Sequence, residues 1–220
     1  MNLIQTHRSP NYTPQRLGYA PSVIVNHITA GLMPGCLQWL CNPVAQVSSH
    51  YLVTKAGTVY QLVQDENTAW TCGDVESPTW PLYQIGMNPN TISLNIEHEA
   101  ISPWDALTEQ QYQASLALHH MLCNKHHIPR DNMHIIGHSA LNTRNRAFDP
   151  GPLFPWERLF SDLNREVRIR FNGAWIETDT LMEQGRTMVP IRFVEHLGYT
   201  VHWDGQSKTI DIWPEHSSGY

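Results

Sequence analysis

The stretch MHIIGHSALNTRNRAFDPGPLFP, residues 133–155, carries the signals that decide the fold. It opens with a short apolar run, residues 133–136, of the kind that forms a buried strand, and His138 follows that run closely. Asp149 comes later, directly before a Pro-Gly turn. A second apolar run, residues 22–26, ends in the same way at His27. The sequence therefore places two imidazoles and a carboxylate at the edges of rigid elements.

These three side chains are of the types that bind a catalytic metal. A catalytic zinc ion takes three protein ligands and leaves its fourth position to water. We therefore predict one zinc ion bound by His27, His138 and Asp149. Taken singly, a histidine at a strand end is more often structural than metal-binding, so the prediction rests on the set.

Strand and helix signals alternate up to residue 164. Residues 91–97 alternate like a strand, and residues 50–63 indicate a hairpin that turns at Gly57. Thr108 and Gln111 form a capping box that opens the longest helix, which should end before Pro129. The other expected segments are an extended lead-in (1–20), a short helix (34–40), a long loop (68–90) and a last helix (about 153–164). This pattern predicts an α/β domain, residues 1–164, with a central mixed β-sheet flanked by helices.

Residues 165–220 are expected to form a separate, small, β-rich α+β module. Residues 167–177 predict a hairpin that turns at Asn172-Gly173, the strongest short hairpin signal. A short helix over 187–198 should end at Gly198, and residues 200–213 predict a second hairpin. A unit of about fifty residues buries little surface, so we expect it to need a partner surface for stability.

Composition excludes several classes of protein. The formal net charge is −6 and no Lys/Arg cluster stands out, which argues against binding to nucleic acid. The N-terminus has no apolar run of signal-peptide length, and no stretch reaches the roughly 20 residues that span a bilayer. We therefore expect synthesis in the cytoplasm without a signal peptide, and no membrane insertion. The four cysteines are scattered and contain no CxxC pair, so buried thiols are expected rather than disulfides or a cysteine zinc cluster.

Five short motifs keep a consistent order and spacing over about residues 20–160. They are VNHIT (25–29), SSHYLV with GTVYQLV (48–53 and 57–63), SLNIE (93–97), GHS (137–139) and FDPGPLFPW (148–156). Each motif is weak alone, but together they resemble the type 2 N-acetylmuramoyl-L-alanine amidases. That family includes phage endolysins and is related to the peptidoglycan-recognition proteins.

The resemblance implies a zinc hydrolase of bacterial peptidoglycan. Its target would be the amide bond between N-acetylmuramic acid and the L-alanine of the stem peptide. His27, His138 and Asp149 fall on the family's metal ligands, and Glu97 falls on its catalytic carboxylate. Such a carboxylate accepts a proton from water and passes it to the leaving amine. Glu99 lies on the same face of the predicted strand and competes for this role, and only the resemblance favours Glu97.

Three positions depart from the family pattern. Many relatives carry a lysine where Ala147 stands, a histidine where Thr71 stands, and some phage relatives a tyrosine where Ser49 stands. Arg146 or Arg144 could replace the lysine in stabilising the oxyanion, although exposed loop arginines are an equally good interpretation.

Further candidates for contact with the substrate are Arg146, Trp70 and His50. His50 is expected to pack beside the site without binding metal. Trp70, Trp80 and Trp104 could form a sugar-stacking cleft, but packing is the better interpretation for each. The adjacent pairs His119/His120 and His126/His127 are expected at the surface or in loops.

The C-terminal module resembles a small repeat named after the N-terminal domain of copper amine oxidases. The motifs are VPIRFV (189–194), LG (197–198) and VHWDG (201–205). Its body contains only His196 and His202, so no copper cluster is expected. We expect this module to attach the chain to the cell wall, to contact a protein, or only to stabilise the chain.

The functional hypothesis is a bacteriolytic endolysin of the phage type that reaches the wall after release through a holin or lysis. The alternatives are a non-catalytic peptidoglycan binder, disfavoured because all three ligands are present, and a cytoplasmic amidase that recycles muropeptides. A serine hydrolase is a remote alternative, since Gly137–Leu141 echoes G-x-S-x-G but ends in leucine. The sequence specifies neither the target bacterium nor the oligomeric state.

Overall fold

The computed structural model of the protein describes residues 1–164, 169–171, 174–176, 181–183, 186–205, 207 and 209–215. The chain divides into two compact units, Met1–Arg165 and Glu166–Tyr220. Among the described residues, no helix is both long and apolar enough to cross a membrane.

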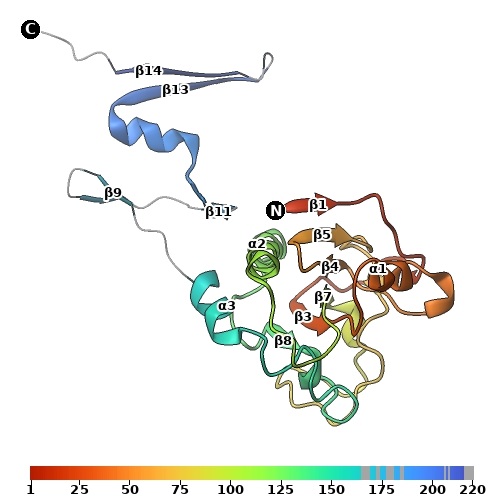
Figure 1. Ribbon diagram of the computed structural model, residues 1–220. Coiled ribbons are helices and arrows are strands. Elements are labelled where there is room, and N and C mark those ends of the chain that lie inside the picture. The colour runs from red at the N-terminus through yellow and green to blue at the C-terminus, as the bar shows by residue number, and fades with distance from the viewer. Residues whose placement is uncertain are drawn as a thin grey trace, which may run out of the picture. The chain divides into compact units, whose positions relative to one another are not determined.

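The first unit is built on a six-stranded mixed sheet, seen edge-on in Figure 1. Its strands, in order across the sheet, are β1 (Asn2–Ile4), β5 (Thr58–Gln61), β4 (Tyr51–Val53), β7 (Ser93–His98), β3 (Val23–Ile28) and β8 (Ile135–Gly137). The last four run parallel to one another, β5 is antiparallel to β4, and β1 is parallel to β5. The prediction of an α/β domain with a central mixed sheet is confirmed.

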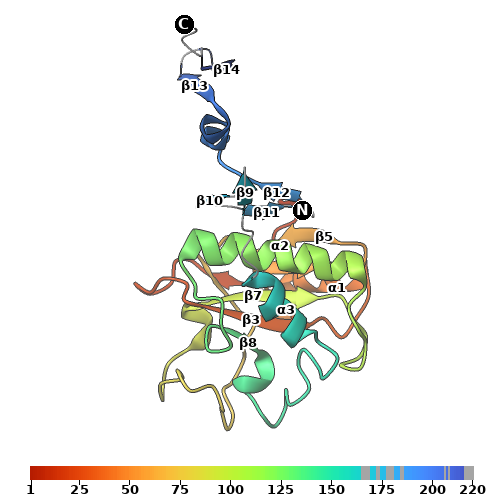
Figure 2. The same ribbon diagram turned by 90° about the vertical axis from the view of Figure 1, so that its left-hand side faces the viewer.

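Helices cover the two faces of this sheet. The long helix α2 (Glu109–His126) and α3 (Trp156–Leu163) lie against one face, and α1 (Gly35–Leu40) lies on the other (Figures 1 and 2). Alternation along each strand sorts the side chains between the layers. Ile24, Leu94 and Ile96 pack in the cluster that contains α2 and α3. The odd-numbered positions of β3 and β7 therefore face the other way.

Short segments complete the first unit. They are the strands β2 (Tyr12–Thr13) and β6 (Thr68–Ala69), and the 3-10 helices η1 (Pro43–Ala45), η2 (Pro89–Thr91) and η3 (His138–Ala140). The expected extended lead-in is only partly right, because β1 joins the sheet edge and β2 pairs with β6. Arg16 also anchors this segment, since its buried guanidinium donates to the carbonyl groups of Asp65, Thr91 and Ser93.

One of the two hydrogen bonds of the predicted capping box is present at the start of α2. The Thr108 hydroxyl accepts a hydrogen bond from the Gln111 N–H (3.1 Å). The Gln111 side chain does not return the bond, because its Nε2 donates to the carbonyl groups of Val53 and Glu99 (3.0 and 3.1 Å). The helix ends at His126, before Pro129 as expected, and the capping residue His127 is in the left-handed conformation.

The histidines of α2 correct a prediction. His119 and His120, expected at the surface, are 0 % and 7 % exposed. The His119 ring donates from Nδ1 to the Ser115 carbonyl (2.8 Å). Because α2 packs against both the sheet and α3, more than one side of this helix is covered, and adjacent histidines can both be buried.

The described residues of the second unit form three antiparallel strand pairs and a 3-10 helix. Its elements are β9 (Ile169–Phe171), β10 (Ala174–Ile176), β11 (Leu181–Glu183), β12 (Arg186–Met188), η4 (Ile191–Leu197), β13 (Tyr199–Asp204) and β14 (Thr209–Pro214). The predicted Asn172-Gly173 turn lies outside the described residues. The predicted helix starts at residue 191 rather than 187, because residues 186–188 pair with β11 as a strand. Gly198 ends this helix with a φ of +80°, as expected from glycine.

Candidate metal centre

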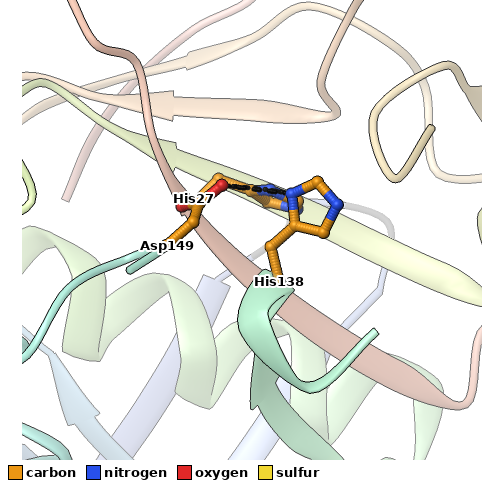
Figure 3. Close-up of side chains that lie close together, drawn as sticks. All are labelled: His27, His138 and Asp149. Atoms are coloured by element: carbon orange, nitrogen blue, oxygen red, sulfur yellow. Dashed lines mark hydrogen bonds and ion pairs between the residues drawn. The ribbon is translucent and has the colours of Figure 1, made fainter. Parts of the chain in front are cut away.

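His27, His138 and Asp149 converge on one point, as Figure 3 shows. His27 lies near the end of β3, His138 directly follows β8, and Asp149 comes from the loop before α3. The His138 Nδ1 atom lies 3.1 Å from both the His27 Nδ1 and the Asp149 Oδ2 atoms. The His27 Nδ1 and Asp149 Oδ2 atoms are 3.6 Å apart. The structure thus brings together all three residues of the predicted set.

These distances have the size of one face of a tetrahedral zinc site. Zinc–ligand bonds of about 2.0–2.1 Å place tetrahedral ligand atoms about 3.3–3.4 Å apart. The other ring nitrogens are bonded to acceptors: His27 Nε2 to the Asn95 side-chain oxygen (3.0 Å), and His138 Nε2 to the Cys72 carbonyl (2.8 Å). Each neutral ring therefore carries its proton on Nε2 and directs a lone pair from Nδ1. Two lone pairs and a carboxylate oxygen repel one another without a cation, so the donor set fits zinc.

Electrostatics keep the carboxylate charged. Burial opposes ionisation of Asp149, but the effect of the neighbouring His138 and His27 outweighs burial and lowers the pKa of Asp149. Burial lowers the pKa of His138, whereas at His27 the effect of burial is outweighed by Asp149, which raises the pKa. The Asp149 Oδ1 atom accepts from the Ile28 N–H (2.9 Å), which leaves Oδ2 to face the two rings.

The geometry separates the two candidate carboxylates. Glu97 lies beside His27 in the β3–β7 register and lines the cleft, and its Oε2 atom is buried without a hydrogen-bond partner among the described residues. Burial raises the pKa of Glu97 to about 8, with opposing effects of His27 and Arg146 and a further increase from Asp149. Both oxygens of Glu99 accept backbone N–H groups, from Met33 (2.9 Å) and Lys55 (2.7 Å). Glu99 is therefore occupied in holding two loops, and Glu97 faces the cleft.

A cleft of about 800 Å³ opens beside the three ligands and Glu97. A smaller hollow of about 440 Å³ shares His138 and Arg146 with it. Arg146 is exposed, lines both cavities and forms no ion pair within the described part of the chain. Arg144 pairs with Glu76 (3.1 Å) and is less available. Ala147 lines the cleft without any charge, so Arg146 is the cation best placed there.

His50 packs behind the site, in contact with β7. Its side chain is fully buried (0 % exposed) and lines neither cavity. Its Nδ1 atom accepts from the Asn95 N–H (3.1 Å), and its Nε2 atom lies 2.7 Å from the Arg16 guanidinium. The structure therefore offers no support for the predicted contact with substrate, and His50 holds β7 through the Asn95 N–H.

The three tryptophans lie in different surroundings and do not form one cleft. Trp70 lines the smaller hollow, and its Nε1 donates to the Thr13 hydroxyl (2.9 Å). Trp80 is buried in the core and donates to the Met133 carbonyl (2.8 Å). Trp104 is exposed, and its ring centroid lies 5.5 Å from that of Phe148. Of the three, Trp70 is the one that lines a described cavity.

Two residues at the site were not anticipated from the sequence, Asn95 and Cys72. Asn95 lies two residues before Glu97 in a strand, so the period of two already places it on the same face. Cys72 contributes its main-chain carbonyl, which no residue-type pattern can reveal.

Comparison with known proteins gives two family matches. Residues 17–152 match the model of the N-acetylmuramoyl-L-alanine amidase family. Residues 164–212 match the copper amine oxidase N-terminal domain.

Individual relatives are also amidases. The chain is 26 % identical over 164 residues to N-acetylmuramoyl-L-alanine amidase A of Achromobacter lyticus, covering 65 % of this chain and 83 % of the relative. It is 29 % identical over 150 residues to amidase AmiD of Escherichia coli K12, covering 62 % and 51 %. It is 34 % identical over 113 residues to the 1,6-anhydro-N-acetylmuramyl-L-alanine amidase AmpD of Salmonella typhimurium LT2, covering 51 % and 55 %. The chain thus spans about half the length of the latter two.

Solved structures share the fold. A selenomethionine AmpD derivative matches with a TM-score of 0.60 at 26 % identity, covering 73 % of this chain and 94 % of that one. AmiD from E. coli, in complex with anhydro-N-acetylmuramic acid-L-Ala-D-γ-Glu-L-Lys, matches with a TM-score of 0.55 at 28 % identity, covering 64 % and 57 %. The endolysin LysCS of Clostridium intestinale, at 21 % identity and a TM-score of 0.55 over 75 % of this chain and 97 % of that one, is similar in fold.

Proposed function

The chain belongs to the N-acetylmuramoyl-L-alanine amidase family, and on that premise we propose that it is a zinc-dependent hydrolase of bacterial peptidoglycan. The bond it cleaves joins the lactyl group of N-acetylmuramic acid to the L-alanine of the stem peptide. The observation that carries the proposal is the convergence of three ligand atoms, 3.1–3.6 Å apart, beside a cleft that Glu97 lines.

His27, His138 and Asp149 would hold the zinc ion. When bound there, zinc supplies a Lewis acid that polarises the amide carbonyl and lowers the pKa of water towards about 7. Glu97 takes the proton from the attacking water and delivers it to the leaving amine of L-alanine, a role that its unpartnered oxygen in the cleft supports. Arg146 offsets the negative charge that develops on the carbonyl oxygen, in place of the lysine that many relatives carry where Ala147 stands.

Within this proposal, the physiological substrate is the polymeric wall, as for an endolysin. The support is the second unit, because a separate module after the catalytic unit can retain an enzyme on an insoluble polymer. A second candidate substrate is a soluble anhydro-muropeptide. It is favoured by two relatives, since AmpD is named for the 1,6-anhydro substrate and the AmiD structure contains an anhydro-muropeptide.

One experiment tests both the bond that is cleaved and the requirement for zinc. Purified sacculi are digested with the full chain, with zinc or with a chelator, and the products are analysed by mass spectrometry. Free N-terminal L-alanine that appears only with zinc is expected. New reducing sugar ends, or release that a chelator does not prevent, would contradict the proposal.

The rate on sacculi is then compared with the rate on a soluble anhydro-muramyl tripeptide at equal stem-peptide concentration. A preference of about tenfold or more for sacculi supports the wall as substrate. The opposite preference supports the soluble muropeptide.

A further inference from the structure

A single amide oxygen contacts one imidazole of the metal centre and also the residue whose carbonyl group binds the other imidazole. Asn95, on β7, is completely buried, and its Oδ1 atom lies 3.0 Å from the His27 Nε2 atom. The Cys72 thiol donates to the same Oδ1 atom at 3.3 Å. The main-chain carbonyl of Cys72 in turn accepts from the His138 Nε2 atom at 2.8 Å. The two residues therefore touch each other and one imidazole each.

We propose that Asn95 and Cys72 act together as positioning residues, which fix the tautomer and the orientation of both imidazoles so that their Nδ1 atoms face the metal. The inference rests on the proposed zinc site and adds to it. Groups that accept the second N–H of a metal-binding histidine typically account for 10–100-fold in metal affinity.

The orientation of the Asn95 amide follows from its surroundings. Its Nδ2 atom donates to the Ser93 hydroxyl (2.9 Å), and its Oδ1 atom faces both His27 and the Cys72 thiol. An acceptor at that place requires a proton on His27 Nε2 and therefore a free lone pair on Nδ1. The reversed amide would favour the proton on Nδ1, which would point it at the metal position. The backbone of Asn95 is also held, since its carbonyl accepts from the Ser49 hydroxyl (2.8 Å).

Hydrogen bonds to Asn90 also hold the backbone of Cys72 in place. The Asn90 side-chain oxygen accepts the N–H groups of both Thr71 (3.2 Å) and Cys72 (2.9 Å), which directs the Cys72 carbonyl towards His138. Burial raises the pKa of the Cys72 thiol to about 12, so it remains an S–H donor at neutral pH. The Asn95 oxygen thereby joins β7 to the loop that carries the His138 acceptor, and the two rings are positioned by one connected unit.

The main test is zinc affinity, measured by competition with a chromophoric chelator. Asn95→Leu keeps the branched shape of the side chain and removes the acceptor, and should weaken zinc binding about 10–100-fold. Asn95→Asp restores an acceptor oxygen and should recover most of that loss. Asn26→Leu is the matched control, because Asn26 is an equally buried amide on β3 that bonds to the Ile136 carbonyl (3.3 Å) instead of an imidazole. It should lower stability without changing zinc affinity.

The thiol is tested by Cys72→Ala, which keeps the carbonyl and removes only the S–H group. It should weaken zinc binding a few-fold, and the loss should disappear in an Asn95→Leu background, because the thiol acts through the Asn95 oxygen. Additive losses in the double variant would contradict the proposed unit.

A measurement on the unmodified, metal-free protein needs no variant. The ring ¹⁵N shifts of His27 and His138 at pH 8 should show the proton on Nε2. A proton on Nδ1 of either ring, or unchanged zinc affinity in Asn95→Leu, would overturn the inference while leaving the zinc amidase intact. Failure of the wild-type chain to bind one zinc ion would instead refute the proposed metal site itself, and this inference with it.

Discussion

Acidification should destabilise the metal-free protein through histidines that it buries, and His119 offers the clearest test. Its side chain is 0 % exposed, its Nδ1 donates to the Ser115 carbonyl, and its Nε2 is buried without a partner among the described residues. Burial lowers the pKa of His119 to about 4; the hydrogen bond to Ser115 opposes the shift and His120 adds to it. The perturbation is His119→Asn, which keeps an N–H donor and removes the titratable ring.

The sign and size follow from proton linkage. A histidine in the unfolded chain has a pKa of about 6.5, so between pH 7 and pH 5 the unfolded state takes up the proton and the folded state does not. Stability therefore falls as the pH falls, and this one residue accounts for about 2 kcal/mol over that interval. His50 and His98, whose pKa values burial lowers to about 3, add losses of the same sign. His27 acts in the opposite direction, because Asp149 outweighs the effect of burial and raises its pKa.

The assay is urea unfolding at pH 7, 6 and 5, with a chelator present so that metal binding adds no pH dependence. The wild-type chain should lose stability steeply, and His119→Asn should lose about 2 kcal/mol less between pH 7 and pH 5. His7→Asn, at an exposed position, is the control and should follow the wild type. Equal losses in His119→Asn and the wild type would refute the argument.

Three further predictions follow from the site and its loops. Glu97→Gln should lower kcat about 10²–10⁴-fold while zinc stoichiometry, measured by elemental analysis, stays at one; loss of the metal would mean that Glu97 has a structural role instead. Arg146→Ala should lower kcat about 10²–10³-fold, whereas Arg144→Ala, which removes only an exposed pair, should leave kcat nearly unchanged; similar effects of the two would count against the oxyanion role. Gly151→Ala should lower the free energy of unfolding by about 2–6 kcal/mol, because φ is +106° and a Cβ would overlap a facing backbone carbonyl. Gly73→Ala, with φ +57° and open space around it, should cost only about 1–2 kcal/mol in chemical denaturation, so equal costs would be inconsistent with the overlap.

The sequence alone was sufficient to find the three converging side chains. His27 and His138 each follow an apolar run, and the strands β3 and β8 lie side by side and parallel. Residues at the same ends of neighbouring parallel strands must meet, whatever the loops between them do. Sequence could not give the order of the strands, because the addition of β1 at the sheet edge depends on pairing with a segment more than fifty residues away.

The choice between Glu97 and Glu99 shows a different limit. Both residues lie on one face of β7, so periodicity treats them alike. What separates them is the backbone N–H groups of Met33 and Lys55, which come from two loops and take both oxygens of Glu99. Contacts to main-chain groups of distant loops leave no pattern of residue types, and the same is true of the Cys72 carbonyl that holds His138.

Three adjacent strands, β7, β3 and β8, deliver Glu97, His27 and His138. Neighbouring strands are about 4.8 Å apart in any sheet, so the spacing of these groups is inherited from the hydrogen-bond ladder. Substitutions in the cleft-lining loop 143–148, other than at Arg146, can consequently admit new ligands without moving these three groups. A shift of the β3 register by one residue would instead turn His27 to the α2 side of the sheet and remove this ligand from the metal centre. Substitutions in descendants of this chain can thus change the ligand that is recognised more easily than the reaction that is catalysed.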